Sequence, residues 1–119
     1  MNNKPELVNI KPSRSAPLRF KGWCIAETEW TTNRGNLMSF EIWKTVGGSL
    51  IAVREGDDEY GNRYVDACVV EPIEPGPADE DAEPPFAMVD AVMTFFDYHD
   101  RARSMVKKQL KWSILRRVA

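Results

Sequence analysis

The stretch that decides the fold is residues 37–55, LMSFEIWKTVGGSLIAVRE. In its first half apolar and polar side chains alternate, with Phe40 and Ile42 on the same side. A period of two residues is typical of a β-strand. Gly47 and Gly48 follow, and a glycine pair between β-forming segments favours a tight hairpin because both positions tolerate positive φ. The stretch therefore predicts two antiparallel strands joined by a glycine turn.

Similar patterns flank this hairpin on both sides. Residues 18–30 alternate in the same way before the turn sequence TTNRGN. Residues 63–71, RYVDACVVE, follow the polar loop GDDEYGN and also alternate. Short segments of this kind, separated by turn residues, usually pair with their neighbours in the chain. The sequence therefore predicts an antiparallel meander of four strands.

Two helices are expected after the strands. Residues 71–85, EPIEPGPADEDAEPP, contain five prolines and six acids, and they carry too little apolar surface to fold, which predicts a linker. Beyond them, apolar residues recur at the three- and four-residue spacing of a helix: Phe86, Val89, Val92, Met93 and Phe96. Asp100 favours a break before a second helical stretch, because aspartate is a common N-cap residue.

These elements predict a single α+β domain over residues 18–119. It consists of a four-stranded antiparallel β-meander (residues 18–71), the acidic, proline-rich linker (71–85) and two C-terminal helices (86–118) packed on one face of the sheet. Residues 1–17 are polar and contain three prolines, and we expect them to form a flexible N-terminal arm. A chain of 119 residues can close one hydrophobic core and is too short for two ordinary domains.

The net charge of −2 conceals a strong segregation of charge along the chain. Residues 55–100 hold fourteen of the eighteen acids and one base, whereas residues 101–119 hold seven of the sixteen bases. The N-terminus lacks the apolar stretch of a secretory signal, and nowhere do eighteen apolar residues run together. We therefore expect a soluble cytoplasmic protein that does not bind membranes.

The sequence carries no catalytic, metal or cofactor signature. His99 is the only histidine, and Cys24 and Cys68 fall in predicted strands among apolar neighbours, where a thiol keeps a high pKa. The two cysteines lack the paired spacing of a zinc site and are expected to be reduced. We therefore expect no catalytic residue, no metal, no cofactor and no enzymatic activity.

An exposed apolar patch is one candidate site. If the helices cover the sheet face that carries Phe40 and Ile42, the opposite face presents a patch made of Trp23, Ile25, Leu37 and Trp43. Patches of this kind usually mark a protein interface. Alternation does not say which face is buried, so the reverse arrangement, with the tryptophans in the core, stays open. An unpaired edge strand would also favour dimerisation.

The basic C-terminal segment is the other candidate site. At about 100° per residue, the apolar residues from Ala102 to Trp112 fall on one arc of a helix. The seven cations fall on the opposite arc or at the end of the segment: Arg101, Arg103, Lys107, Lys108, Lys111, Arg116 and Arg117. Two interpretations stay open, because these cations either form a solvated surface or contact the phosphates of a nucleic acid in a salt-dependent manner.

We therefore expect a small, non-catalytic protein-interaction module. Its expected partner is a protein. This partner is either a different protein or a second copy of the chain, in a homodimer formed through the sheet face or an edge strand. Compact acidic chains without motifs are common among accessory proteins and inhibitors of bacterial or phage origin, and we expect this chain to belong to that group by association. The alternative function is nucleic-acid binding by the basic C-terminal helix.

Overall fold

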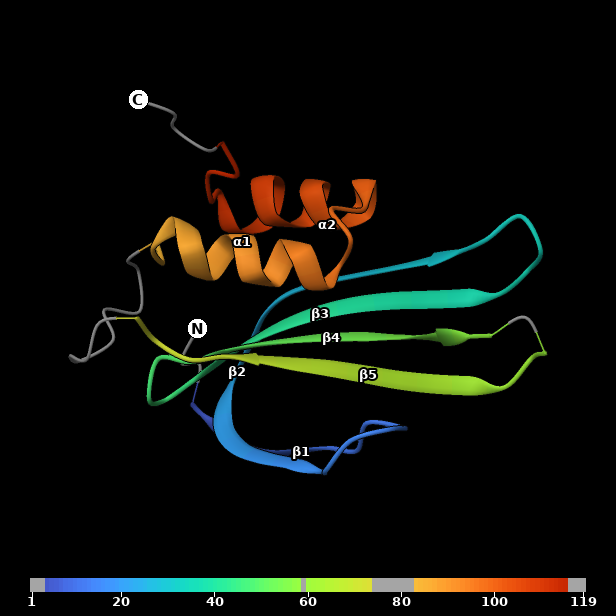
Figure 1. Cartoon of the computed structure of the whole chain (residues 1–119), viewed down its shortest axis with the longest axis horizontal. Helices are drawn as coiled ribbons and strands as arrows, with labels where there is room; N and C mark the ends of the chain where they lie inside the picture. The colour runs from blue at the N-terminus through green and yellow to red at the C-terminus, as the bar shows by residue number, and fades with distance from the viewer. Residues whose placement is uncertain (1–3, 59, 74–82, 116–119) are drawn as a thin grey trace.

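The protein folds into a curled antiparallel sheet with short helices on one face, an α+β arrangement (Figure 1). The computed structural model describes residues 4–58, 60–73 and 83–115. In these ranges five strands lie side by side in chain order: β1 (Glu6–Ile10), β2 (Leu18–Thr31), β3 (Leu37–Thr45), β4 (Leu50–Asp57) and β5 (Arg63–Val70). The helices are α1 (Phe86–Phe95) and α2 (Asp100–Met105), and a π-helical turn, η1 (Val106–Leu110), continues α2 directly.

The sheet has one strand more than the sequence predicts. Residues 6–10, placed above in a flexible arm, form β1 and pair antiparallel with the first part of β2, from Glu6 opposite Gly22 to Ile10 opposite Leu18. The strand is only five residues long and lies between Pro5 and Pro12, and this polar, proline-containing setting obscured it. Most of the predicted linker, residues 74–82, lies outside the described residues.

The predicted glycine hairpin is confirmed, and its turn recurs at the two neighbouring hairpins. In each turn a glycine N–H donates to the carbonyl of a Thr or Asp three residues earlier. The side-chain oxygen of that Thr or Asp accepts a second hydrogen bond from the residue after the glycine. These glycines, Gly35, Gly48 and Gly61, have φ of 82°, 91° and 80°. This geometry is a three-residue hairpin loop that ends in a left-handed glycine.

A bend in β2 gives the sheet its curl. The pairing between β2 and β3 shifts at a β-bulge between Cys24 and Ala26, and bulges bend and twist the strand that carries them. The first part of β2 and β1 therefore curl beneath the face of β3, β4 and β5 that lies away from the helices (Figure 1). Ile10 and Phe20 pack there against Trp43, and a second, smaller core forms.

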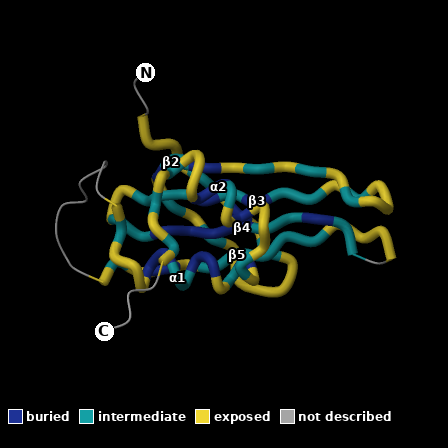
Figure 2. The backbone as a smooth tube through the Cα atoms, turned by 90° about the horizontal axis from the view of Figure 1, so that it is seen from above, coloured by how far each residue is buried: buried dark blue, intermediate teal, exposed yellow. Residues whose placement is uncertain are grey.

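The main core lies between the sheet and the helices. Residues of β3 and β4, among them Phe40, Ile42 and Leu50, pack against the apolar faces of α1, α2 and η1. Figure 2 shows this buried layer in the middle of the molecule, with exposed residues at the turns. Ala102 and Met105, on the predicted apolar arc of the last helix, are buried in this core. The prediction of a helix up to residue 118 is wrong at residues 111–115, because η1 ends at Leu110 and Lys111 adopts a left-handed conformation with φ of 56°.

The helical region is interrupted between α1 and α2, as the sequence predicts. The N–H groups of Asp97 and Tyr98 donate to the carbonyls of Thr94 and Met93, which closes α1 in a Schellman motif. Asp97 and Tyr98 both have positive φ, at 56° and 50°. The N-cap of α2 is His99 rather than Asp100, and its Nδ1 accepts from the N–H of Arg101.

Arg54 on β4 ties the end of α1 to the sheet. Its Nη1 donates to the carbonyl of Phe95 over 2.9 Å, and its Nη2 pairs with the carboxylate of Asp66 over 2.8 Å. A guanidinium at the C-terminus of a helix also interacts favourably with the helix dipole. Among the described residues, none of the helices is long and apolar enough to cross a membrane.

Candidate functional site: an acidic sheet face and an open strand edge

The four apolar residues predicted to form one patch are divided between the two faces of the sheet. The bulge places Ile25 against the main core, whereas Trp43 packs in the second core, with its ring 5.9 Å from the ring of Phe20. Trp23 lies opposite Lys44, and Leu37 lies at the far end of β3 with 38% of its surface exposed. The four residues do not form a single exposed patch.

The uncovered half of the sheet face away from the helices is acidic. Phe40 and Ile42 face the helices, so the alternate positions on β2, β3 and β4 face the other way. Four glutamates occupy that face and line an open hollow of about 430 Å³: Glu27, Glu29, Glu41 and Glu55. Glu55 pairs with Arg63 over 3.3 Å. Within the described part of the chain, Glu27, Glu29 and Glu41 form no ion pair.

Burial and the crowding of charge on this face raise the pKa of two neighbouring groups. Burial raises the pKa of Glu41 above 4.5, and the charges of Glu27 and Glu55 raise it further. Burial raises the pKa of the Cys24 thiol from 9.0 to about 11, and Glu41 and Glu27 add to the increase. Like charges disfavour each other's ionised form. A bound cation would relieve this repulsion.

Alkylation of Cys24 tests the charge on this face. Because a pKa of about 11 leaves much less thiolate at pH 8 than the ordinary value of 9.0, we expect Cys24 in a Cys68→Ser background to react with iodoacetamide at least about tenfold more slowly than a cysteine peptide. The same background with Glu27→Gln and Glu41→Gln should react faster, because two charges that raise the pKa are gone. A rate equal to that of the peptide would contradict this electrostatic environment.

Cys24, Glu27 and Glu41 also bring possible metal ligands together. The thiol sulfur and the two carboxylate oxygens all lie within 4.8 Å of one another. They offer three ligands on an open surface, one fewer than a closed tetrahedral site has, and no histidine is among them. Exposed carboxylates often cluster without binding an ion. These three residues belong to the acidic face.

The outer edge of β2 is open beside this face. β1 pairs only with residues 18–22 of β2, and among the described residues no other strand pairs with the outer edge of β2 from Cys24 to Thr31. At Glu27 the side-chain amide of Gln109 from η1 takes that place: its Oε1 accepts from the Glu27 N–H over 3.1 Å, and its Nε2 donates to the Glu27 carbonyl over 2.8 Å.

The basic residues lie on the helical layer. The described cations of the predicted set are all exposed there: Arg101, Arg103, Lys107, Lys108 and Lys111. The guanidinium of Arg101 lies over the ring of Trp30 at 5.6 Å, and that of Arg103 lies over the ring of Tyr98 at 5.8 Å. Arg116 and Arg117 lie outside the described residues. The cations therefore face solvent, which both sequence interpretations require.

The surroundings of Cys24, Cys68 and His99 favour a structural role over a catalytic one. His99 stacks on Trp30, with ring centroids 5.2 Å apart, on the helix side of the sheet. Cys24 lies on the opposite face, opposite Trp43 in the strand register, so the two residues are not brought together. Burial raises the pKa of Cys68, and Asp66 raises it further. Neither thiol has the lowered pKa of a reactive cysteine.

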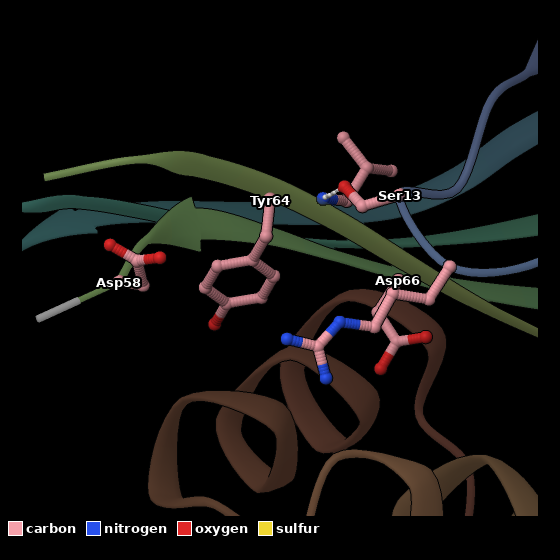
Figure 3. A pocket seen from close by; sticks show the side chains of 6 residues that line it. Ser13, Asp58, Tyr64 and Asp66 are labelled. Carbon is pink, nitrogen blue, oxygen red and sulfur yellow. Dashed lines mark hydrogen bonds between the residues drawn. The ribbon is translucent and has the colours of Figure 1, made fainter. Parts of the chain in front are cut away.

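A second hollow of about 250 Å³ lies at the edge of β5. Figure 3 shows the ring of Tyr64 between Asp58 and Asp66, and the lining also includes Ser13 and Arg14. Ser13 holds the loop before β2 against β5, since its N–H donates to the carbonyl of Val65 over 2.8 Å and its hydroxyl accepts from the Val65 N–H over 2.9 Å. This contact covers part of the β5 edge.

Comparison with known proteins gives no match to this chain among protein-family models, curated proteins or solved structures.

Proposed function

We propose that this chain is a small protein-interaction module that binds a cationic segment of a protein partner on the acidic face of β2, β3 and β4. It acts by binding, without catalysis or a cofactor. The observation that carries the proposal is the set of glutamates around one open hollow, of which Glu27, Glu29 and Glu41 form no ion pair within the described part of the chain. An accessory or inhibitory role in bacteria or phage fits a module of this kind.

The raised pKa of Glu41 supports a cationic ligand. Burial is the largest cause of the increase, and repulsion by Glu27 and Glu55 adds to it. A lysine or arginine placed among these carboxylates would favour their ionised forms and would replace repulsion with attraction. Complementary charge of this kind mainly increases the rate of association and the specificity, and its effect falls with salt. The predicted interaction is therefore selective and salt-dependent.

Binding of a model peptide tests the proposal. A fluorescein-labelled twelve-residue peptide of alternating lysine and threonine should bind in 50 mM NaCl by fluorescence anisotropy. Replacing Glu27 and Glu41 by glutamine should weaken binding by about tenfold, since each ion pair at a surface contributes up to about 1 kcal/mol. Glu6→Gln with Glu71→Gln changes the net charge equally outside the hollow and should leave the affinity unchanged. Equal affinities for the two double variants would contradict the proposal.

Nucleic-acid binding by the helical layer is the second candidate function. It is favoured by the exposure of every described cation from Arg101 to Lys111. The same anisotropy measurement with a labelled twenty-base single-stranded DNA separates the two functions. Two results together would favour nucleic-acid binding. The unaltered protein would bind the DNA but not the peptide, and the Lys107→Gln, Lys108→Gln, Lys111→Gln variant would no longer bind the DNA.

A further inference from the structure

The outer edge of β2 specifies how the cationic segment binds. We infer that the partner adds to the sheet as an antiparallel strand along β2, hydrogen-bonded to the backbone of Glu29 and Thr31, with its basic side chains over the acidic face. This inference rests on the proposed function and adds the binding mode, which is strand addition at a sheet edge.

The register of the β2–β3 hairpin shows which backbone groups point outward. The Thr32 N–H donates to the carbonyl of Asn36 over 2.8 Å at the turn. In an antiparallel pair, residues alternate between those bonded to the partner strand and those that point away. Thr28 and Trp30 therefore bond to β3, and the N–H and C=O groups of Glu29 and Thr31 point outward. Within the described residues these outward groups have no hydrogen-bond partner.

The chain itself shows that this edge accepts an amide. The side chain of Gln109 forms a two-bond contact with the outward N–H and C=O of Glu27, two residues before Glu29. A peptide group in an added strand would make the same pair of bonds at the next outward positions. Since Glu29 and Thr31 are exposed, the backbone beside them is accessible.

The other two sheet edges are less suited to a partner strand. β1 has only five residues and lies between prolines. At β5, Ser13 occupies the outward groups of Val65, and the carboxylate of Asp66 accepts from the Ala67 N–H over 3.1 Å. Short length and local hydrogen bonding are common ways of protecting an edge. The second half of β2 has neither protection at Glu29 and Thr31.

Charge defines the sequence of the added strand. Residues paired across an antiparallel ladder point to the same face. The partner residues bonded to Glu29 and Thr31 therefore point to the acidic face, beside Glu27, and should be lysine or arginine. The alternate residues point toward Trp30, over whose ring Arg101 lies, and should be uncharged. The fitting ligand is an extended segment with a cation at every second position.

A second copy of the chain fits this edge poorly. A symmetric antiparallel pairing of β2 with β2 centred on Glu29 would place Glu29 opposite its own copy. Like charges directly opposite each other destabilise a strand pair. The edge therefore selects a basic partner over self-association, and a peptide-induced dimer would count against the inference.

Backbone methylation of the peptide tests the mode without altering the protein. In the antiparallel arrangement the lysine N–H groups face β2, so the alternating peptide with N-methylated lysines should bind at least tenfold more weakly than its isomer with N-methylated threonines. A ratio of affinities near one, or reversed, overturns the inference while the proposed function stands. If the unmethylated peptide does not bind at all, the proposed function fails as well.

A variant of the protein gives an independent readout. Thr31→Pro removes an outward N–H and leaves the bonds between Trp30 and β3 in place, and proline is tolerated at the open side of an edge strand. We expect Thr31→Pro to bind the unmethylated peptide about tenfold more weakly than Thr31→Val, which keeps the N–H. Equal binding by two variants with native circular dichroism would overturn the inference, and the methylated peptides decide the case if Thr31→Pro does not fold.

Discussion

Phe96→Ala is expected to lower the free energy of unfolding by about 3–5 kcal/mol, the usual cost of truncating a buried phenylalanine. Phe96 is 1% exposed at the C-cap of α1, and its ring centroid lies 4.4 Å from that of Phe40 on β3. It also contacts the ring of Phe95 at 5.3 Å. The substitution therefore leaves a cavity at the point where the helices meet the sheet.

Urea unfolding followed by circular dichroism measures this loss. Since small domains are stable by about 5–15 kcal/mol, a folded variant should remain, with a clearly lower transition midpoint. Phe86→Ala is the matched control, because Phe86 is 37% exposed at the start of α1. It should cost less than about 1 kcal/mol. Similar losses for the two variants would show that α1 does not pack on the sheet as described.

Gly22→Ala is expected to lower the free energy of unfolding by about 3 kcal/mol, at the upper end of the usual cost of overpacking. A Cβ at position 22 would lie 2.2 Å from the carbonyl oxygen of Lys44 and 3.0 Å from its carbonyl carbon. These are backbone atoms of the neighbouring strand, and they cannot move without disturbing the pairing of β2 with β3. Gly22 lies where β2 pairs with both β1 and β3.

Gly47→Ala is the control for the position of the clash. A Cβ at Gly47 would meet only the Oγ1 of Thr45, at 3.9 Å, and Gly47 does not have positive φ. The same chemical change should therefore be neutral or stabilising by up to about 1 kcal/mol. Urea unfolding of both variants is the measurement. Equal midpoints would mean that β1, β2 and β3 do not approach each other as closely as the structure indicates.

The hairpins were predictable from the sequence because they depend on local chemistry. The sequence indicated the Gly47-Gly48 turn, and the same signal is present at Thr32 and Asp58, where a Thr or Asp stands three residues before a glycine. The break before α2 was also predictable, although His99 and not Asp100 caps the helix. In each case the deciding residues lie within five positions of one another.

The candidate site was not predictable, because it depends on pairing between distant residues. Alternation predicted Ile25 and Trp43 on one face, but the bulge between Cys24 and Ala26 places Ile25 against the main core, whereas Trp43 packs in the second core. The bulge inserts one residue, so the side chains before it and after it follow alternations that are offset by one position: Cys24 pairs with Trp43, and Ala26 pairs with Ile42. The contact between Gln109 and Glu27 joins residues 82 positions apart and has no local signal.

The open edge of β2 could not be predicted from the sequence either. Its length follows from β1, which ends its pairing at Gly22, and β1 itself was hidden between prolines. A strand lies at the edge of a sheet when no further strand pairs with its outer side. The alternation of apolar and polar residues within the strand does not indicate whether such a neighbour exists. Only the complete strand order shows that the residues from Glu27 to Thr31 carry both the acidic side chains and the outward backbone groups.

The most direct test is a map of amide chemical shifts in the ¹⁵N-labelled protein during titration with the alternating lysine–threonine peptide. The largest changes should occur at Glu27, Glu29, Thr31 and Glu41, and the amides of Glu29 and Thr31 should gain protection from hydrogen exchange. Changes confined to α2 and η1, around Lys107 and Lys108, or no change at the acidic face, would contradict the proposed site.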